Sequence, residues 1–394
     1  MDNTKEKACL CALNRIFGFE PKIGLALISH LGSASEVFSL SDKDLDTLLG
    51  PYSRYRGQIC WSRAEAELEE LARLSQRGIR FTGWTENGYP ELLKECSDPP
   101  LGLYIRGRTP DKELWENRRL VSVVGTRDLS PYGREWCTRL VRAMGLSSEK
   151  PSIVSGLALG TDICAHRVAL ESGLPTIGVM ATGPETIYPL RHTDFAERLC
   201  STPGCALITD YPPGTAPLAI HFLRRNRIIA GLSEGTVLIE SKIKGGGMMT
   251  ANLASSYGRG VYAVPGRIDD ICSQGCNLLI GKKVAEAITG EADFIRSLGM
   301  TTGRMKHVAP DDRGRIAALY GKTMPADRIE LMARALLAIR RRRGITVEEL
   351  SEHLGTDYGT TSVITGILES DGLISIDLLQ RCCINIVRQD ILSE

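Results

Sequence analysis

The chain has 394 residues, of which 43% are hydrophobic and 24% are charged, and its formal net charge is +1. This composition is typical of a soluble globular protein of two or three domains. A charge this close to zero excludes a global positive field, so any affinity for nucleic acid must come from local basic patches.

Neither a metal site nor a membrane segment is expected. The twelve cysteines are scattered and form no C-x-x-C pair, which predicts reduced, half-buried thiols rather than a zinc site. Residues 1–7 carry charges of both signs and lead into no signal-peptide pattern, and no apolar run approaches the roughly 18 residues of a spanning helix. We therefore expect a cytoplasmic protein.

The first zone of the chain, residues 1–80, has helical spacing of its apolar residues. Leu10, Leu13, Ile16 and Phe17 show this spacing, and glycines such as Gly32 interrupt it. Several short helices joined by tight turns are expected, forming a small N-terminal helical domain.

The second zone, residues 81–297, alternates short apolar runs with helical stretches. Most of the runs end in Gly, Ser or Pro and precede a helix pattern, which predicts βαβ units. The expected strands are Leu120–Val124, Ser152–Val154, Thr176–Met180, Ala206–Thr209, Thr236–Glu240 and Val261–Val264. The predicted fold class is therefore α/β, with a doubly wound, mostly parallel sheet of the Rossmann kind.

The loops after these strands are the candidate sites, because ligands of doubly wound sheets lie beyond the carboxyl ends of the strands. Gly125, Thr126 and Arg127 form a turn into a helix that begins near Ser130, where backbone N–H groups and a guanidinium suit a phosphate. No G-x-G-x-x-G follows, so a dinucleotide site is weakly supported.

A second loop, Ser155–Asp162, contains Gly156 and Gly160, which let backbone approach a ligand closely. Asp162 and His166 would share one helix face. They are either an acid–base pair or an N-cap aspartate that steadies a core histidine.

Two further loops are basic. Phe222 precedes Arg224, Arg225, Asn226 and Arg227, which are expected just before an apolar helix and suit nucleic-acid backbone and bases. Lys242, Lys244 and the glycines up to Gly247 come between a strand and a helix that contains Thr250, and again predict an anion cradle.

The third zone begins with a linker, residues 298–327, and continues as a C-terminal domain, residues 328–394. A helix from Arg328 ends in four arginines, Thr346 and Glu349 form a capping box, and a second helix precedes two strands. This order predicts a winged helix-turn-helix. The recognition helix, Thr360–Ser370, carries no Lys or Arg, so contact with protein is as reasonable as contact with DNA.

The ordered set of motifs resembles the DNA-processing protein A family (DprA, also called Smf) over nearly the whole chain. The motifs that carry the resemblance are Asp98-Pro99-Pro100, Gly125-Thr126-Arg127, Tyr132-Gly133, Ser155-Gly156-Leu157-Ala158, Ala165-His166, Tyr188-Pro189, Arg225-Asn226-Arg227-Ile228-Ile229-Ala230-Gly231-Leu232, Thr250-Ala251, Pro265-Gly266 and Gly275-Cys276-Asn277-Leu278-Leu279-Ile280.

The resemblance implies an extended Rossmann core that binds single-stranded DNA, displaces single-strand-binding protein and loads RecA recombinase during natural transformation. It also implies a homodimer through the core, a sterile-alpha-motif-like or helix-hairpin-helix-like N-terminal domain, no cofactor and no catalytic residue. The residues expected to contact DNA are Gly125, Thr126, Arg127, Ser155, Gly156, Phe222, Arg225, Asn226, Arg227, Lys242, Lys244, Gly246, Gly247 and Thr250.

Two alternatives remain open. A nucleotide phosphoribohydrolase of the lysine-decarboxylase-like Rossmann group has a similar strand–Gly–helix layout, but its Pro-Gly-Gly-x-Gly-Thr turn is reduced here to Pro265-Gly266-Arg267. A winged-helix transcription regulator is disfavoured by the uncharged recognition helix.

Overall fold

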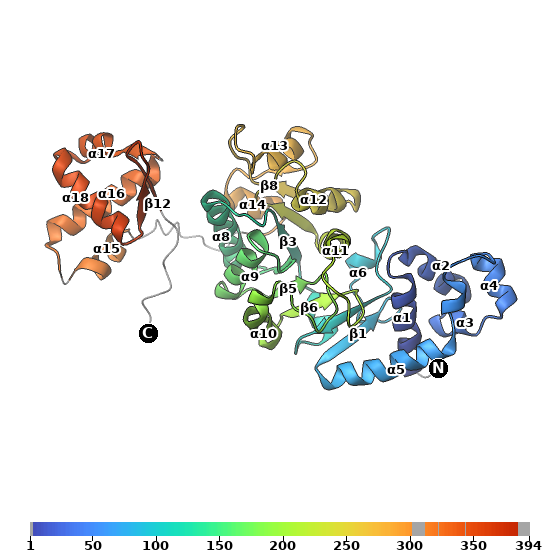
Figure 1. Cartoon of the computed structure of the whole chain (residues 1–394). Coiled ribbons are helices and arrows are strands. Elements are labelled where there is room, and N and C mark those ends of the chain that lie inside the picture. Colours follow the sequence, from blue (N-terminus) through green and yellow to red (C-terminus); the bar gives the residue numbers. More distant parts are fainter. Residues whose placement is uncertain (1–2, 302–311, 322, 343, 385–394) are drawn as a thin grey trace. The chain divides into compact units, whose positions relative to one another are not determined.

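The chain forms two compact units, Met1–Gly303 (unit 1) and Arg304–Glu394 (unit 2). The structure, a computed structural model, describes residues 3–301, 312–321, 323–342 and 344–384. Each unit has its own hydrophobic core, and the elements of both units are drawn in Figure 1.

Unit 1 begins with five helices, which we call the helical module. They are α1 (Asn3–Phe17), α2 (Pro21–Leu31), α3 (Ala34–Phe38), α4 (Asp42–Leu49) and α5 (Trp61–Gln76), with a short 3-10 turn, η1 (Arg56–Gln58), before α5. Ser41 and Asp44 form a capping box at α4, and Gly32 ends α2 with a positive φ of 93°. The helical zone and its tight turns are thus where the apolar spacing predicts them.

The helical module shares its core with the first two strands of the sheet. Its buried cluster contains Leu10, Leu13 and Phe17 of α1 together with Phe81 and Tyr104 of the sheet. The domain boundary expected at residue 80 falls inside the first strand, because this strand packs against α1 and α5. The module and the sheet are therefore parts of one packed unit.

The sheet of unit 1 has nine strands in the described residues. They are β1 (Ile79–Gly83), β2 (Gly102–Arg106), β3 (Leu120–Val124), β4 (Ser152–Ser155), β5 (Thr176–Val179), β6 (Ala206–Thr209), β7 (Gly235–Leu238), β8 (Gly260–Ala263) and β9 (Glu286–Ala287). Their order is β1-β2-β6-β5-β4-β3-β7-β8-β9, and all pairs are parallel except β1–β2 and β2–β6. All six predicted strands are confirmed, whereas β1, β2 and β9 were not predicted.

The remaining helices of unit 1 connect and cover the strands. They are α6 (Glu91–Lys94), α7 (Asp111–Trp115), α8 (Pro131–Leu146), α9 (Thr161–Glu171), η2 (Leu190–His192), α10 (Thr193–Ser201), α11 (Ala219–Leu232), α12 (Gly246–Ser256), α13 (Gln274–Gly281) and α14 (Glu291–Ser297). α8 packs against α9 and α14, whereas α11 packs against α12 and α6 (Figure 1). Right-handed crossovers place these two groups on opposite faces of the sheet.

The strand order reverses between β3 and β7. From β3 the chain moves through β4 and β5 to β6, and it then returns to place β7 on the other side of β3. This point is the topological switch of a doubly wound sheet, where the loops after β3 and β7 diverge and leave room for a ligand.

The helices and strands predicted from residue 328 onward are present in unit 2, whereas its first helix and its first short strand were not predicted. Unit 2 consists of α15 (Asp312–Tyr320), α16 (Ala326–Arg341), β10 (Ile345–Thr346), α17 (Val347–Leu354), α18 (Tyr358–Ser370), β11 (Ile374–Ile376) and β12 (Arg381–Ile384). Thr346 and Glu349 form the expected capping box, and the three strands pair in the order β10-β12-β11. This is the arrangement of a winged helix.

The segment expected to be a linker, residues 298–327, is partly packed. Leu298 and Met300 are buried in unit 1, and α15 packs against α16 in the core of unit 2. Residues 302–311 of this segment lie outside the described residues. In the described part of the chain, no helix has the length and apolarity required to cross a membrane.

We predict that a fragment ending at Gly303 folds without unit 2, because unit 1 buries its own core and contains all nine strands of the described sheet. Circular dichroism melting of this fragment should show one cooperative transition. A fragment that is unfolded at room temperature would show that unit 1 depends on unit 2.

Candidate nucleic-acid interface

The loops after β3 and β7 meet at the topological switch. A Cβ on Gly247, at the start of α12, would lie 3.1 Å from the Cα of Gly125, and a Cβ on Gly125 would lie 2.5 Å from the Oγ1 of Thr161. Glycine is required at both positions because the backbones approach too closely for a side chain. We call this edge, formed by the loops after β3, β4, β5 and β7 and the first turns of α11 and α12, the switch edge.

The N-terminus of α8, where the sequence predicts an anion site, is filled by a carboxylate of the chain itself. Glu240 follows β7, and its Oε2 accepts a hydrogen bond of 3.0 Å from the backbone N–H of Ser130, while the Ser130 hydroxyl donates to Oε1. A Cβ on Gly133 would lie 2.4 Å from Glu240 Oε2. The positive end of the α8 dipole is thus already compensated by Glu240, so this N-terminus is not open to an external anion.

The N-terminus of α12 is open. Gly246 is exposed, and a Cβ built on it would meet no atom within 4 Å. Lys242 and Lys244, in the loop before the helix, are also exposed. Because the N–H groups of a first helical turn have no partner within the helix, this turn and the two lysines are exposed groups that could accept an anion, as the sequence predicts.

The basic segment after Phe222 was expected as a loop before a helix, and this prediction is wrong. Residues 222–227 lie inside α11, which begins at Ala219. The side chains of Arg225, Asn226 and Arg227 are buried there. They therefore face the protein and not the solvent.

Arg225 holds the ends of two strands. Its side chain is 3% exposed, and its Nη1 donates a hydrogen bond of 2.6 Å to the carbonyl of Gly156 after β4 and another to the carbonyl of Val179 at the end of β5. Burial lowers the pKa of this guanidinium to about 10, against the opposing effect of Asp162. A Cβ on Gly156 would lie 2.3 Å from Arg225 Nη1, so Gly156 makes room for the arginine.

Arg227 is held in a similar way. It donates a hydrogen bond of 2.6 Å to the buried carboxylate of Asp210 and another to the carbonyl of Asp98. Asn226 accepts a hydrogen bond of 3.3 Å from Arg225 Nε. These three side chains, expected to meet DNA, serve in this structure to fix α11 against the sheet.

Two polar residues of the expected site are also turned inward. The Ser155 hydroxyl donates a hydrogen bond of 2.6 Å to the carbonyl of Val123, and the Thr250 hydroxyl donates one of 3.4 Å to the carbonyl of Gly246. Thr126 accepts the backbone N–H of Thr161 at its carbonyl and that of Asp128 at its hydroxyl. They shape the loops of the switch edge.

Arg127, Phe222 and Tyr188 form a cation–aromatic cluster at the surface of the switch edge. The guanidinium of Arg127 lies 5.2 Å from the ring centroid of Phe222, and the rings of Phe222 and Tyr188 meet edge to face with their centroids 5.3 Å apart. Arg127 is exposed, Phe222 is partly exposed and Tyr188 is 45% exposed. This cluster can offer a ring face to a base and a guanidinium to a phosphate.

Tyr188 is the residue of this cluster that the predicted site leaves out. The sequence contains a signal for it, because Tyr188 precedes Pro189 in the loop after β5, at the same edge as the other candidates. An exposed aromatic side chain in a loop at this edge indicates a binding site more strongly than a buried aromatic side chain does.

Asp162 and His166 do not form an acid–base pair in this structure. His166 Nδ1 lies 2.6 Å from the Thr176 hydroxyl, and burial lowers its pKa to about 3, so the ring is neutral near pH 7. Asp162 accepts the N–H of Ala158, and burial raises the pKa of its carboxyl. Within the described residues, no group of three or more His, Cys, Asp and Glu side chains could hold a metal ion.

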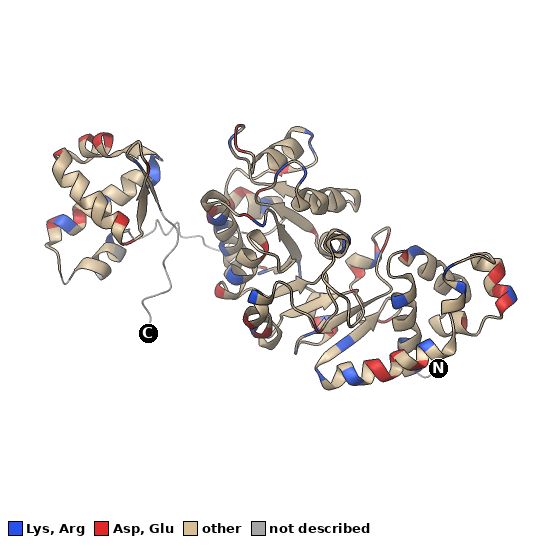
Figure 2. Cartoon of the chain, in the orientation of Figure 1, with Lys and Arg blue, Asp and Glu red and all other residues tan. Residues whose placement is uncertain are grey.

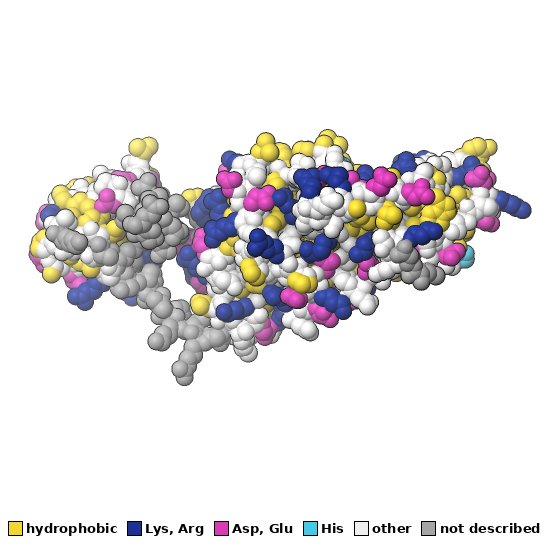
Figure 3. Space-filling model, turned by 90° about the horizontal axis from the view of Figure 1, so that it is seen from below, with side chains coloured by type: hydrophobic (Ala, Val, Ile, Leu, Met, Phe, Trp, Pro, Cys, Tyr) yellow, Lys and Arg dark blue, Asp and Glu magenta, His cyan; other side chains and the backbone are white. Residues whose placement is uncertain are grey.

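Basic and acidic side chains are mixed on the surface of unit 1, as the near-zero net charge of the chain suggests. Figure 3 shows one face on which Lys and Arg side chains are interspersed with acidic and apolar ones. Opposite charges this close together limit the range of the field of each basic group.

Comparison with known proteins agrees with this fold. A family model described as "DNA recombination-mediator protein A" matches residues 80–299, which is more than half of the chain. "DNA processing protein DprA" of Bacillus subtilis (strain 168) is 31% identical over 306 residues, covering 76% of this chain and 96% of that protein. "DNA processing protein DprA" of Streptococcus pneumoniae (strain ATCC BAA-255 / R6) is 35% identical over 226 residues, covering 57% of this chain and 77% of that protein.

A solved structure is similar as well. The X-ray structure of DNA processing protein A (DprA) from Streptococcus pneumoniae has a TM-score of 0.61 at 28% sequence identity, covering 75% of this chain and 98% of that chain. The resemblance seen in the motifs is thereby confirmed. This chain belongs to the DNA recombination-mediator protein A family, whose members are also named DprA and Smf.

Proposed function

We propose that the switch edge of unit 1 binds single-stranded DNA. The observation that carries this proposal is the exposed Arg127–Phe222–Tyr188 cluster on the same edge as the open N-terminus of α12. Single strands are bound without sequence preference where aromatic rings accept bases and cationic or N–H groups accept the backbone. The edge supplies both kinds of contact.

The basic groups near the switch edge fall into an exposed set and a buried set. Arg127, Lys242, Lys244 and the first turn of α12 are exposed and can meet phosphates, whereas Arg225 and Arg227 are already hydrogen-bonded inside the unit. Arg127 also covers one face of Phe222. When a strand binds, we expect the guanidinium to move to a phosphate and leave this face to a base.

The names of the relatives point to the role of the bound strand. A recombination mediator delivers single strands to a recombinase, so we propose that this protein protects incoming single strands, displaces single-strand-binding protein and loads RecA in the cytoplasm during DNA uptake. We also propose a homodimer through the core. Leu278 and Ile280 of α13 are partly exposed apolar residues that can take part in such an interface.

The region of unit 2 that contains the recognition helix is a poor candidate for the DNA site. From Val347 to Ile384 it has one basic residue, Arg381, and seven acidic ones, which are Glu348, Glu349, Glu352, Asp357, Glu369, Asp371 and Asp377. This region repels phosphates, whereas the basic residues of unit 2 lie mainly before it, as at the end of α16. Because the switch edge belongs to unit 1, binding should remain in a fragment of unit 1.

The first prediction separates phosphate contacts from base contacts. Arg127→Ala should flatten the slope of log affinity against log salt by about 0.7, because one phosphate contact is lost. Phe222→Ala should weaken binding by about 1–3 kcal/mol with the slope unchanged, because a stacking ring carries no charge. Fluorescence anisotropy of labelled oligothymidylate over a salt series measures both effects.

The matched control is Arg142→Ala. Arg142 is similarly exposed, but it lies near the far end of α8, where it faces Glu171. Its removal should leave affinity and slope near those of the unmodified protein. If Arg127→Ala is folded and also leaves both unchanged, DNA does not bind at this edge.

A second prediction concerns the buried arginine. Arg225→Met should lower the free energy of unfolding by about 2–4 kcal/mol, because it leaves the carbonyls of Gly156 and Val179 without their donor. Arg127→Ala should change it by less than about 0.5 kcal/mol. Urea unfolding compares the two. Equal stability of both variants would contradict the structural role of Arg225.

A third prediction concerns catalysis. We expect no release of base or phosphate from nucleotides, because His166 is buried and neutral and Asp162 is hydrogen-bonded beneath the loop. A chromatographic assay of nucleotides incubated with the purified protein measures this. Sustained turnover that disappears in Asp162→Ala would support the phosphoribohydrolase alternative instead.

A further inference from the structure

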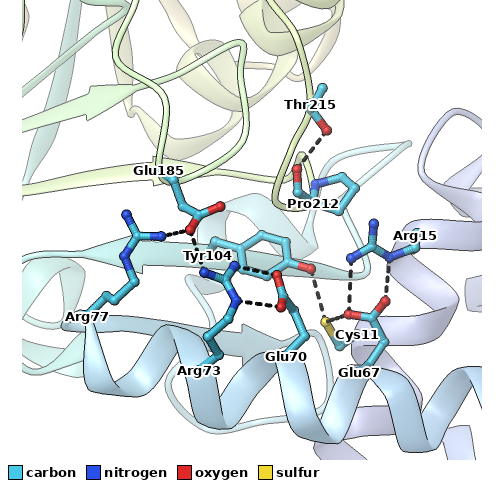
Figure 4. Close-up of polar contacts among 10 residues, drawn as sticks. All are labelled: Cys11, Arg15, Glu67, Glu70, Arg73, Arg77, Tyr104, Glu185, Pro212 and Thr215. Atoms are coloured by element: carbon cyan, nitrogen blue, oxygen red, sulfur yellow. Dashed lines mark hydrogen bonds and ion pairs between the residues drawn. The ribbon is translucent and has the colours of Figure 1, made fainter.

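The loop between β5 and α10, residues 180–190, is tied to the helical module by a pair of arginines. Glu185 of this loop accepts Arg73 Nη1 of α5 at 2.9 Å and also contacts Arg77, which follows α5 (Figure 4). The same loop carries Tyr188 three residues later. We call it the Tyr188 loop.

We infer that Glu185 is a positioning residue for DNA, through which Arg73 and Arg77 of the helical module hold Tyr188 where its ring can accept a base. The inference rests on the proposed function of the switch edge and goes beyond it. It gives the helical module a part in binding DNA without touching it.

The root of the Tyr188 loop is fixed to the sheet side of the unit. The Thr182 hydroxyl donates to the carbonyl of Thr186, and the Thr209 hydroxyl donates to the carbonyl of Thr182. The N–H of Gly183 donates to the carbonyl of Thr215, whose own hydroxyl binds the carbonyl of Pro212 (Figure 4). These bonds hold residues 182–186 but do not reach Tyr188.

The outer side of the loop is separated from β1 and β2 by a cavity of about 400 Å³. The cavity is lined by Arg77, Ile79, Arg106, Glu185, Thr186, Ile187, Leu190, Thr193 and Glu197. Glu185, Thr186 and Leu190 are partly or fully exposed at this cavity, whereas Ile187 is buried in a hydrophobic cluster with Met180 and Leu199. Across this space the Arg77–Glu185 contact joins the module to the loop.

Helix α5, which carries Arg73 and precedes Arg77, is itself anchored by buried contacts. Glu67 of α5 is buried, and it accepts hydrogen bonds from the Cys11 thiol, at 3.1 Å, and from Arg15, both of α1 (Figure 4). The Cys11 sulfur also lies 3.0 Å from the hydroxyl of Tyr104 in β2. α5 is therefore held to the sheet by buried polar contacts as well as by the shared core.

Among Glu70, Arg73, Arg77 and Glu185, Glu185 is the residue whose substitution tests the link between α5 and the Tyr188 loop. Its side chain is 18% exposed, so its interaction with two guanidiniums is less screened than that of a surface pair. If Glu185 is neutralised, Arg73 keeps its contact with Glu70 at 2.7 Å, which leaves α5 intact (Figure 4). Along α5 the acidic residues lie between Arg63 and Arg73 and do not alternate with basic ones (Figure 2).

Electrostatics and positioning predict opposite results for Glu185→Gln. Removing a negative charge near a DNA site should strengthen binding if only the field matters. If Glu185 positions Tyr188, the variant should bind labelled oligothymidylate roughly three- to tenfold more weakly, the range expected when a stacking contact is loosened but not removed. The sign of the change therefore distinguishes the two.

The experiment uses the full chain, with anisotropy of oligothymidylate and of an abasic strand of the same length. Glu185→Gln should weaken binding of oligothymidylate and leave binding of the abasic strand unchanged, because Tyr188 acts on bases. In a Tyr188→Ala background the same substitution should have no further effect.

The matched control is Glu197→Gln. It breaks the ion pair with Arg106 at the same cavity, but Glu197 belongs to α10 and not to the Tyr188 loop. This variant should bind both strands as the unmodified protein does. Should Glu185→Gln fail to fold in a melting experiment, Arg73→Ala with Arg77→Ala removes the same contacts from the other side.

The outcomes separate this inference from the proposed function. Glu185→Gln with unchanged or tighter binding of oligothymidylate overturns the inference, and so does an equal loss on both strands. If Tyr188→Ala and Phe222→Ala both bind oligothymidylate normally, the proposed site itself is wrong. Weak binding by Tyr188→Ala together with normal binding by Glu185→Gln contradicts the inference but leaves the proposed function intact.

Discussion

The buried guanidinium of Arg225 organises the switch edge. From the middle of α11 it binds the carbonyl of Gly156, just after β4, and the carbonyl of Val179, at the end of the neighbouring strand β5. An ionised group is costly to bury, and a pKa lowered to about 10 reflects this cost. The hydrogen bonds to both carbonyls offset it, so the loops after the two strands and the first turn of α11 keep one arrangement.

A similar use of charge recurs at α8. There a carboxylate, Glu240, takes the place that an external anion would occupy and joins the end of β7 to Ser130. Internal charges therefore fix the framework on both sides of β3. The groups left for a ligand are few and exposed, which explains how a chain with almost no net charge can present a basic site.

The sequence predicts the sheet well because a parallel strand is a local signal. Leu120–Val124 and Ala206–Thr209 are short apolar runs bounded by turn residues, and both strands have these bounds in the structure. β1 and β2 lack this signal because they are antiparallel and share their core with the helical module. Their assignment depends on contacts with α1 that no local pattern reveals.

The candidate site was harder to predict for the same reason. Three arginines within four residues are typical of an exposed loop. The carbonyls that bind Arg225 in the interior, however, are 69 and 46 residues away in the chain. The carboxylate that closes the N-terminus of α8 is 110 residues from Ser130. Glycine turns predict where loops come close together. They do not predict which of these loops already bind a charged side chain of the chain itself, such as Glu240 or Arg225.

The core that the helical module shares with β1 and β2 has a consequence for how the protein can be shortened or rearranged. Phe81 and Tyr104 are buried against α1, and β1 lies at the outer edge of the sheet. A chain without α1 to α5 would present an apolar strand with unpaired backbone groups at its rim, which is the surface from which intermolecular β-pairing and aggregation begin. The module thus keeps the apolar side chains of this end of the sheet buried.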